Sequence, residues 1–267
     1  MNYQMLVLDI DDTLLTSERT ISERTYDALM DAQKRGVKIV LASGRPTPSM
    51  VETARQLKLD VFDSYIISFN GAVVTRMKDV RELFSQRIEI SEQRAIIDYL
   101  QAQHLVVTTY TDDTIMLDKV NEYSHIEGEL TGLPSVYDEK WIATLDTPRL
   151  KFIGVGDPQI VKQCETALNG QFGEWTYVTT SKPYFLEMMH KDVSKGKAVE
   201  WLCRYLNMEV SQVVACGDGN NDATMIETAG LGIAMGNATD YLKSIADEIT
   251  LSNDEDGIVA VLEKYFR

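Results

Sequence analysis

Met5-Leu6-Val7-Leu8-Asp9-Ile10-Asp11-Asp12-Thr13 begins with four consecutive apolar residues and then turns acidic. An apolar run without alternation indicates a strand that is covered on both faces, as in a parallel sheet. In an open α/β sheet, ligands bind at the carboxyl ends of the strands. Because the acidic residues follow such a strand directly, this stretch predicts a functional site as well as a buried strand.

The segments that follow alternate between helix and strand. Ser22 can cap a helix that precedes a second apolar run over residues 37–42. Thr47-Pro48 offers a cap and a first-turn proline for another helix, and residues 65–69 form a third strand candidate. Helix and strand return near the C-terminus over residues 197–206, 213–216, 223–229 and 231–235. This alternation predicts one doubly wound, mostly parallel, Rossmann-like α/β sheet.

The stretch between these parts has a different pattern. Its strand candidates are residues 104–109, 115–117, 150–155, 175–180 and 185–189, and its helix candidates are residues 91–103 and 158–168. Strands that adjoin strands are typical of an α+β sheet with antiparallel pairs. We therefore expect a discontinuous core over residues 1–82 and 191–267, with an α+β domain inserted over residues 83–190.

Composition excludes several classes of partner. The chain has 26 Lys and Arg against 41 Asp and Glu, a formal charge of −15, so it should repel the phosphate backbone of a nucleic acid. It has no basic leader and no apolar run of membrane-spanning length, so no membrane partner is expected. The three widely spaced cysteines suit a reducing compartment, which predicts a cytoplasmic protein. The oligomeric state is not indicated.

Acidic residues at two of the expected strand ends are suited to a hard cation. Asp9 and Asp11 would point the same way along an extended chain, leaving Ile10 to pack or to present its backbone amide. Asp218 would bring a third acid from a different strand. Like charges so close require a cation, and an all-oxygen cluster suits Mg²⁺. Taken alone, acidic residues that cap a turn explain Asp9, Asp11 and Asp12 equally well.

Other loops carry groups that can bind a phosphate. The Ser43 hydroxyl can donate to a phosphate oxygen, Gly44 lets a backbone amide approach, and Arg45 or Lys195 can supply positive charge. Lys195 stands at an expected helix start, where amide donors also favour an anion. Asp222 can orient Lys195 or a metal-bound water. The alternatives are an ordinary solvated lysine and a plain helix-capping turn.

Taken together, these residues resemble four motifs of the haloacid dehalogenase-like phosphatases and, more narrowly, of their Cof-type sugar-phosphatase group. The motifs, in the family's order, are Asp9-Ile10-Asp11-Asp12-Thr13-Leu14-Leu15, Ser43-Gly44-Arg45, Lys195 and Gly217-Asp218-Gly219-Asn220-Asn221-Asp222. Similarity to the Cof-type group continues in Asn70-Gly71-Ala72, Ala234-Met235-Gly236-Asn237-Ala238 and Ser252-Asn253-Asp254-Glu255-Asp256-Gly257. One motif is weak evidence, but four in order and spacing are specific. Asp12 departs from the pattern, because many relatives have glycine there.

The resemblance implies a Mg²⁺-dependent phosphatase that acts on small phosphomonoesters, with sugar phosphates as the usual range. Asp9 would attack phosphorus and form an aspartyl-phosphate, and Asp11 would serve as general acid and then general base. The implied Mg²⁺ ligands are the Asp9 side chain, the Asp11 backbone carbonyl and the Asp218 side chain. The implied phosphate-binding residues are Ile10, Ser43, Gly44, Lys195 and Asn221. Supporting roles fall to Thr13, Arg45, Asn70, Gly71 and Asp222.

The same resemblance implies that the inserted domain acts as a lid, or cap, that contacts the rest of the substrate. Tyr110, Asp112, Lys119 and Lys151 are candidates for that contact, although packing or solvation more often accounts for such residues. Two other functions stay open. One is a phosphotransferase or phosphomutase on the same scaffold, and the other is a non-catalytic ligand-binding module.

Overall fold

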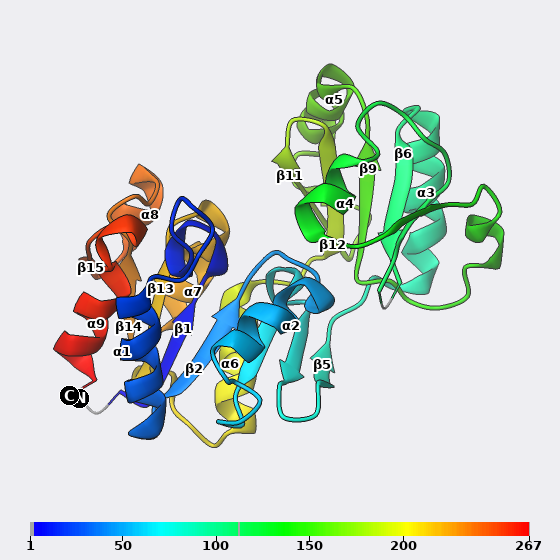
Figure 1. The fold of residues 1–267 in the computed structure, drawn as a ribbon. Helices are drawn as coiled ribbons and strands as arrows, with labels where there is room; N and C mark the ends of the chain where they lie inside the picture. Colours follow the sequence, from blue (N-terminus) through cyan, green and yellow to red (C-terminus); the bar gives the residue numbers. More distant parts are fainter. Residues whose placement is uncertain (1–2, 112, 267) are drawn as a thin grey trace. The chain divides into compact units, whose positions relative to one another are not determined.

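The computed structural model describes residues 3–111 and 113–266, and the chain divides into two compact units (Figure 1). The core unit comprises Met1–Phe84 and Ser194–Arg267, and the inserted unit comprises Ser85–Val193. Asp112, a predicted substrate-contact candidate, lies outside the described residues. Within those residues, no helix has both the length and the apolar character that crossing a membrane requires.

The core unit is built around one mostly parallel sheet. Its strands are β1 (Met5–Leu8), β2 (Lys38–Ala42), β3 (Tyr65–Ser68), β4 (Val73–Arg76), β5 (Arg81–Ser85), β13 (Val213–Gly217), β14 (Leu231–Ala234) and β15 (Glu248–Ile249). They are ordered β15-β14-β13-β1-β2-β3-β4-β5, and β4 runs antiparallel to β3. The first predicted strand, β1, therefore lies inside the sheet, and all four of its residues are buried.

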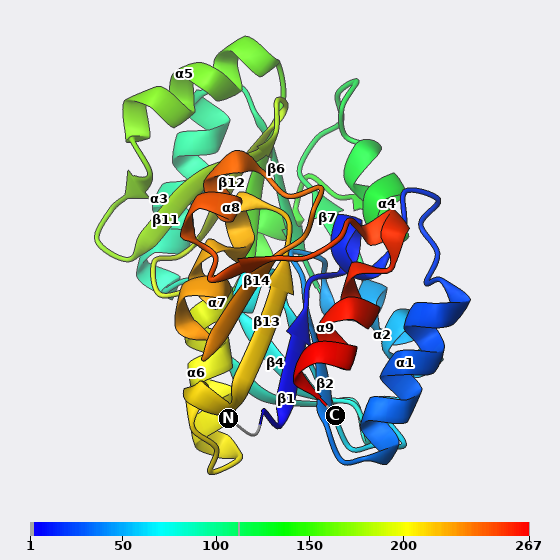
Figure 2. The ribbon, with the colours of Figure 1, turned by 90° about the vertical axis from the view of Figure 1, so that its left-hand side faces the viewer.

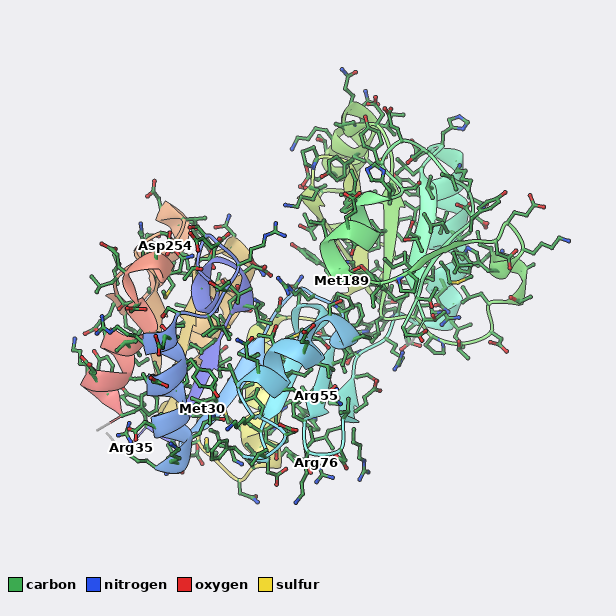
Figure 3. The ribbon with its side chains drawn as sticks, viewed as in Figure 1. Met30, Arg35, Arg55, Arg76, Met189 and Asp254 are labelled. Atoms are coloured by element: carbon green, nitrogen blue, oxygen red, sulfur yellow. The ribbon has the colours of Figure 1, made fainter. Side chains whose placement is uncertain are left out.

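Helices cover both faces of this sheet, which explains why its strands lack alternation. They are α1 (Glu23–Lys34), α2 (Thr47–Gln56), α6 (Lys195–Tyr205), α7 (Ala223–Thr228), α8 (Asp240–Ile245) and α9 (Gly257–Tyr265). Figure 2 shows α6 and α7 on one side of the strands and α1 and α9 on the other. On the α1–α9 side, Arg35, which follows α1 and is labelled in Figure 3, donates a hydrogen bond to the carbonyl of Phe266, which follows α9. The predicted doubly wound fold is confirmed.

The inserted unit is an α+β layer. Its strands are β6 (Val106–Tyr110), β7 (Ile115–Leu117), β8 (Ser135–Tyr137), β9 (Lys151–Val155), β10 (Gln171–Phe172), β11 (Thr176–Lys182) and β12 (Phe185–His190). Its helices are α3 (Ile90–Ala102), α4 (Ile126–Thr131) and α5 (Pro158–Leu168). The strand order is β10-β11-β12-β9-β6-β7-β8, with antiparallel pairs except between β7 and β8. The predicted antiparallel α+β insert is confirmed.

Local signals placed some elements correctly and one cap wrongly. The Ser22 hydroxyl accepts from the Thr25 amide and caps α1 as predicted. Thr47 does not cap α2, because Pro46 occupies the cap position and Thr47 is already helical. The Thr47 hydroxyl instead pairs with Ser68 of β3 at 2.6 Å. The Thr47 hydroxyl, which the sequence predicted to cap a helix, therefore forms a tertiary hydrogen bond instead.

Gly71 makes a backbone approach that no other residue type could make. Its φ of +105° lies in the left-handed region, and a Cβ there would lie 2.2 Å from the Ser194 carbonyl oxygen. Ser194 caps α6 by accepting from the Lys197 amide. The turn after β3 is therefore pressed against the start of the helix that carries Lys195.

Substituting Gly71 by Ala should destabilise the core by about 2–5 kcal/mol, because left-handed strain adds to an overpacked contact. The matched control is Gly36→Ala, which has a φ of +94° but no heavy atom within 4 Å of the added Cβ. We expect the control to lose only about 1–2 kcal/mol of stability, the part that comes from left-handed backbone strain. Urea unfolding followed by circular dichroism measures both, and equal losses would contradict the contact argument.

Candidate active site

The first and fourth motifs lie on neighbouring strands although they are far apart in the sequence. Leu8 at the end of β1 is in register with Cys216 of β13 on one side and Leu41 of β2 on the other. The chain runs outward from β1 through β2, and after the insert it returns to the other side of β1. The direction of winding changes here, and loops diverge at such a switch point to leave room for a ligand.

The backbone after β1 makes a tight turn over Ile10–Leu14. Asp9 and Asp11 are extended, whereas Asp12 has a φ of 57° and lies in the left-handed region. Glycine adopts that region without strain, so an aspartate there departs from the residue type that such a turn favours. Ile10 is fully buried, so its side chain packs into the core and only its backbone remains for a ligand.

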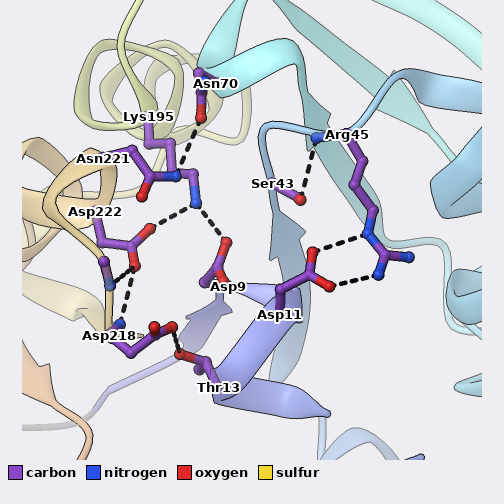
Figure 4. A network of polar contacts seen from close by, with 11 residues as sticks. Asp9, Asp11, Thr13, Ser43, Arg45, Asn70, Lys195, Asp218, Asn221 and Asp222 are labelled. Carbon is purple, nitrogen blue, oxygen red and sulfur yellow. Dashed lines mark hydrogen bonds and ion pairs between the residues drawn. The ribbon is translucent and has the colours of Figure 1, made fainter. Parts of the chain in front are cut away.

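Lys195 is the centre of the polar network in Figure 4. Its ammonium is 2.5 Å from Asp9 Oδ1 and 2.5 Å from Asp222 Oδ1, and its side chain is 0% exposed. Burial alone would lower the pKa of Lys195, but the Asp222 and Asp9 carboxylates outweigh it and raise that pKa above its ordinary value. Lys195 is therefore held as a cation, and the solvated-lysine alternative is wrong.

Asp222 is fully buried and uses both of its carboxylate oxygens. One accepts from Lys195, and the other accepts from the backbone amides of Asp218 and Gly219 at 2.9 Å each. The same side chain thus orients the lysine and shapes the turn that carries Asp218.

The acidic cluster consists of Asp9, Asp218 and Asp222, each of which offers an oxygen within 4.8 Å of the others. Burial raises the pKa of Asp9 well above its ordinary value; Lys195 opposes this, and Asp222 and Asp218 add to it. Burial likewise raises the pKa of Asp218 to about 6, against a hydrogen bond of 2.7 Å from Thr13. Three carboxylates and one ammonium sum to −2, which a single divalent cation would neutralise.

The Asp11 carboxylate lies outside that cluster. Arg45 binds it through two hydrogen bonds, from Nε at 2.8 Å and from Nη2 at 2.5 Å. The Asp11 side chain is 52% exposed. Figure 4 shows Asp9 turned towards Lys195 and Asp11 turned towards Arg45. The two carboxylates therefore have different cationic partners, and Asp11 is not part of the acidic cluster.

The second motif lies on the loop after β2. The buried Ser43 hydroxyl accepts from the Arg45 backbone amide at 3.2 Å, so its own proton is available to a phosphate oxygen. Gly44 lies against Asn70, because an added Cβ would come within 3.1 Å of Asn70 Oδ1. Asn221 donates to that same oxygen at 3.2 Å. The contacts of Arg45, Lys195 and Asp222 therefore bring all four motifs to one edge of the sheet.

Candidates in the inserted unit have partners of their own. Tyr110 donates to Glu127, and Lys151 forms a buried ion pair with Glu187 at 2.8 Å. Lys119 is half-buried. The side chains of Tyr110 and Lys151 are thus committed to contacts within their own unit, which favours the packing alternative for both.

Comparison with known proteins agrees with this geometry. Residues 6–262 match the family model described as haloacid dehalogenase-like hydrolase. The chain is 32% identical to a putative phosphatase of Haemophilus influenzae over 100% of its own length and 99% of the relative's. It is 28% identical to the 5-amino-6-(5-phospho-D-ribitylamino)uracil phosphatase of Bacillus subtilis, covering 99% of this chain and 96% of the relative.

A solved structure is also similar along the whole chain. A haloacid dehalogenase-like hydrolase from Bacteroides thetaiotaomicron superposes with a TM-score of 0.90 at 32% identity, covering 98% of this chain and 99% of that one. The chain therefore belongs to the haloacid dehalogenase-like hydrolase family. The predicted family and the predicted class of enzyme, a hydrolase, are both confirmed.

The raised pKa of Asp218 predicts how its removal changes stability. Its ordinary value of 3.8 rises to about 6, so the folded protein favours the protonated acid. Ionising Asp218 in the folded protein lowers its free energy of unfolding. This loss of stability is absent below about pH 4, grows as the pH rises to about 6, and is complete at pH 7. We expect Asp218→Asn to stabilise the metal-free protein at pH 7.5 by about 1–2 kcal/mol, after a discount for solvent screening.

The measurement is thermal unfolding of both proteins in EDTA at pH 7.5 and at pH 4. A higher Tm for Asp218→Asn should appear at pH 7.5 and vanish at pH 4. An equal difference at both pH values would contradict the assignment of the raised pKa.

Proposed function

We propose that this enzyme is a Mg²⁺-dependent phosphatase that hydrolyses small phosphomonoesters through an aspartyl-phosphate on Asp9. The observation that carries the proposal is the largely buried cluster of Asp9, Asp218 and Asp222 around Lys195, with a formal charge of −2 when all three acids are ionised. A cluster with an unneutralised charge of that size is costly to bury unless a cation joins it. A protein that only bound ligands would have no use for such a cluster.

The donor set fits a magnesium ion. Asp9 and Asp218 supply carboxylate oxygens from neighbouring strand ends, and the Asp11 backbone carbonyl is the third proposed ligand. Mg²⁺ takes oxygen ligands and is usually bound through one or two carboxylates plus substrate phosphate. When bound, it would neutralise the charge of the phosphoryl group. Asp222 is left out of the ligand set, because Lys195 and two backbone amides occupy its oxygens.

Asp9 suits the role of nucleophile because Lys195 holds its carboxylate from one side. The ammonium donates to Asp9 Oδ1 and so fixes the orientation of the carboxylate. Lys195, Ser43, the Gly44 amide and Asn221 are the proposed contacts of the phosphoryl oxygens. All four come from the carboxyl ends of strands or from the start of α6, where donors stabilise developing negative charge.

Asp11 suits general acid and base catalysis because its side chain is accessible. In this structure Arg45 binds both Asp11 oxygens. A phosphate group offers Arg45 the same bidentate partner as a carboxylate. We propose that the substrate draws Arg45 away from Asp11, so that Asp11 can then carry the proton for the leaving group.

The proposed substrates are sugar phosphates and related polyol phosphates. One relative is named as a phosphatase of 5-amino-6-(5-phospho-D-ribitylamino)uracil, a compound whose phosphate is attached to a ribityl chain. That name supports a polyhydroxylated leaving group. The acidic chain, with its charge of −15, makes a nucleic acid an unsuitable substrate.

Replacing Asp9 by Asn should lower kcat by at least about 10³-fold, because an amide cannot form the phosphoenzyme. The fold should survive, since the substitution is isosteric. The matched control is Asp12→Asn, an exposed acid of the same turn, which should keep kcat within about threefold. Phosphate release with a panel of phosphomonoesters and Mg²⁺ measures both variants. Comparable activity of Asp9→Asn and the wild type would rule out this mechanism.

Water rather than a sugar hydroxyl should be the phosphoryl acceptor. Phosphate release from 4-nitrophenyl phosphate should then proceed without any added sugar, stop in EDTA and return with Mg²⁺. A colorimetric phosphate assay is sufficient. Turnover that required an added sugar would favour the phosphotransferase or phosphomutase alternative instead.

A further inference from the structure

We propose that the loop Met235–Thr239, between β14 and α8, is a brace that fixes the separation of the two acid-bearing loops of the core. Asn237 and Thr239 are its positioning residues. The inference rests on the proposed function, because the separation it fixes is that of the Mg²⁺ ligands Asp9 and Asp218. The segment belongs to a motif with no role in the chemistry described above.

One end of the brace holds the loop of Asp9 and Asp11. Asn237 Nδ2 donates to the Asp12 backbone carbonyl at 2.7 Å. Asp12 is the residue whose left-handed φ of 57° reverses the chain between Asp11 and Thr13. A non-glycine residue in that region is uncommon, so the turn at Asp12 has a defined backbone conformation. The hydrogen bond from Asn237 therefore holds the turn at the residue where the chain reverses.

The other end holds the loop of Asp218. The Thr239 backbone amide donates to the Asp218 carbonyl at 3.0 Å, and the Thr239 hydroxyl donates to Asn220 Oδ1 at 2.8 Å. The Met235 amide donates to the Gly217 carbonyl at 2.9 Å. The brace thus binds the fourth motif on both sides of its acid.

The position of the brace follows from the order of the strands. β14 pairs with β13, and β13 separates it from β1. A loop that leaves β14 and contacts the residues after β1 must therefore pass the carboxyl end of β13, where Asp218 lies. Each acid-bearing loop is tied to the same five-residue segment as well as to its own strand.

Asn237 is itself anchored from a third segment. Its Oδ1 accepts from the Asn253 backbone amide at 3.1 Å, and the Asn253 side chain donates to the Leu15 carbonyl at 2.9 Å. Both functional groups of the Asn237 amide are therefore used, which fixes the direction of its donor. Asn237 is exposed, so it contributes no apolar packing to the core. Its role is to fix a geometry rather than to stabilise the fold.

The test measures Mg²⁺ binding without substrate, as the rise of Tm with added MgCl₂. We expect Asn237→Asp, which keeps the size but loses the donor, to weaken the apparent Mg²⁺ affinity about tenfold, equivalent to about 1.4 kcal/mol. Thr239→Val should do the same, and Thr239→Ser should restore binding. In turnover with 4-nitrophenyl phosphate, kcat should fall about tenfold while KM stays within about threefold, because other residues hold the phosphate.

The control is Asn207→Ala. Asn207 is also exposed and follows α6, at the end of the sheet opposite the site. Its left-handed φ of 51° means that alanine should lower Tm without changing the Mg²⁺ affinity. Because the brace acts as a unit, the double variant Asn237→Asp/Thr239→Val should lose little more Mg²⁺ affinity than either single variant.

Unchanged Mg²⁺ affinity in both Asn237→Asp and Thr239→Val would overturn the brace. The brace would also be overturned if these variants, like the control, lowered Tm without weakening Mg²⁺ binding. A wild-type protein that bound no Mg²⁺ would overturn both the brace and the proposed function. A wild-type protein that bound Mg²⁺ but released no phosphate would overturn the proposed function alone, and the binding data would still decide the brace.

Discussion

Lys195 lies out of contact with water between the carboxylates of Asp9 and Asp222, and the core is arranged around this charge. A buried ammonium is tolerated only with close anionic partners, so α6 must begin where both carboxylates can reach it. Gly71 permits that start by leaving room for the Ser194 carbonyl. Asp222 supplies the second carboxylate and also shapes the Asp218 turn. Two ion pairs of one lysine therefore link Asp9, the proposed nucleophile, to the turn that carries Asp218.

The parallel sheet explains why these groups meet. Parallel strands end at the same edge, and the winding changes direction at β1, so the loops after β1 and β13 lie side by side without either closing over the other. The acids project from this edge with more negative charge than Lys195 can balance. Burial raises the pKa of Asp9 and Asp218, and the neighbouring carboxylates add to this rise, so the cluster suits the proposed cation.

Positive charge divides the site into two parts. Lys195 serves the buried acids, whereas Arg45 binds the exposed Asp11. The buried part is fixed by packing and by several backbone hydrogen bonds, and it suits the covalent step that we propose. The accessible part can exchange one anionic partner for another, and it suits proton transfer to and from solvent or substrate. The brace from Asn237 to Thr239 gives a physical reason why the acid-bearing loops keep their separation.

Local patterns in the sequence were enough to predict the buried strand β1, the cap at Ser22 and the antiparallel insert, because strand burial and helix capping act over a few residues. The cationic partners of Asp9 and Asp11 were not predicted. Lys195 and Asp9 are 186 residues apart, and the pairing of Asp11 with Arg45 depends on the order of β1 and β2 in the sheet. Thr47 shows the same limit, since a contact with Ser68 displaced a favourable helix cap. The sequence by itself determined which groups the protein has for its chemistry. Only the tertiary structure decided which charges balance one another, because electrostatic pairing depends on distance in space.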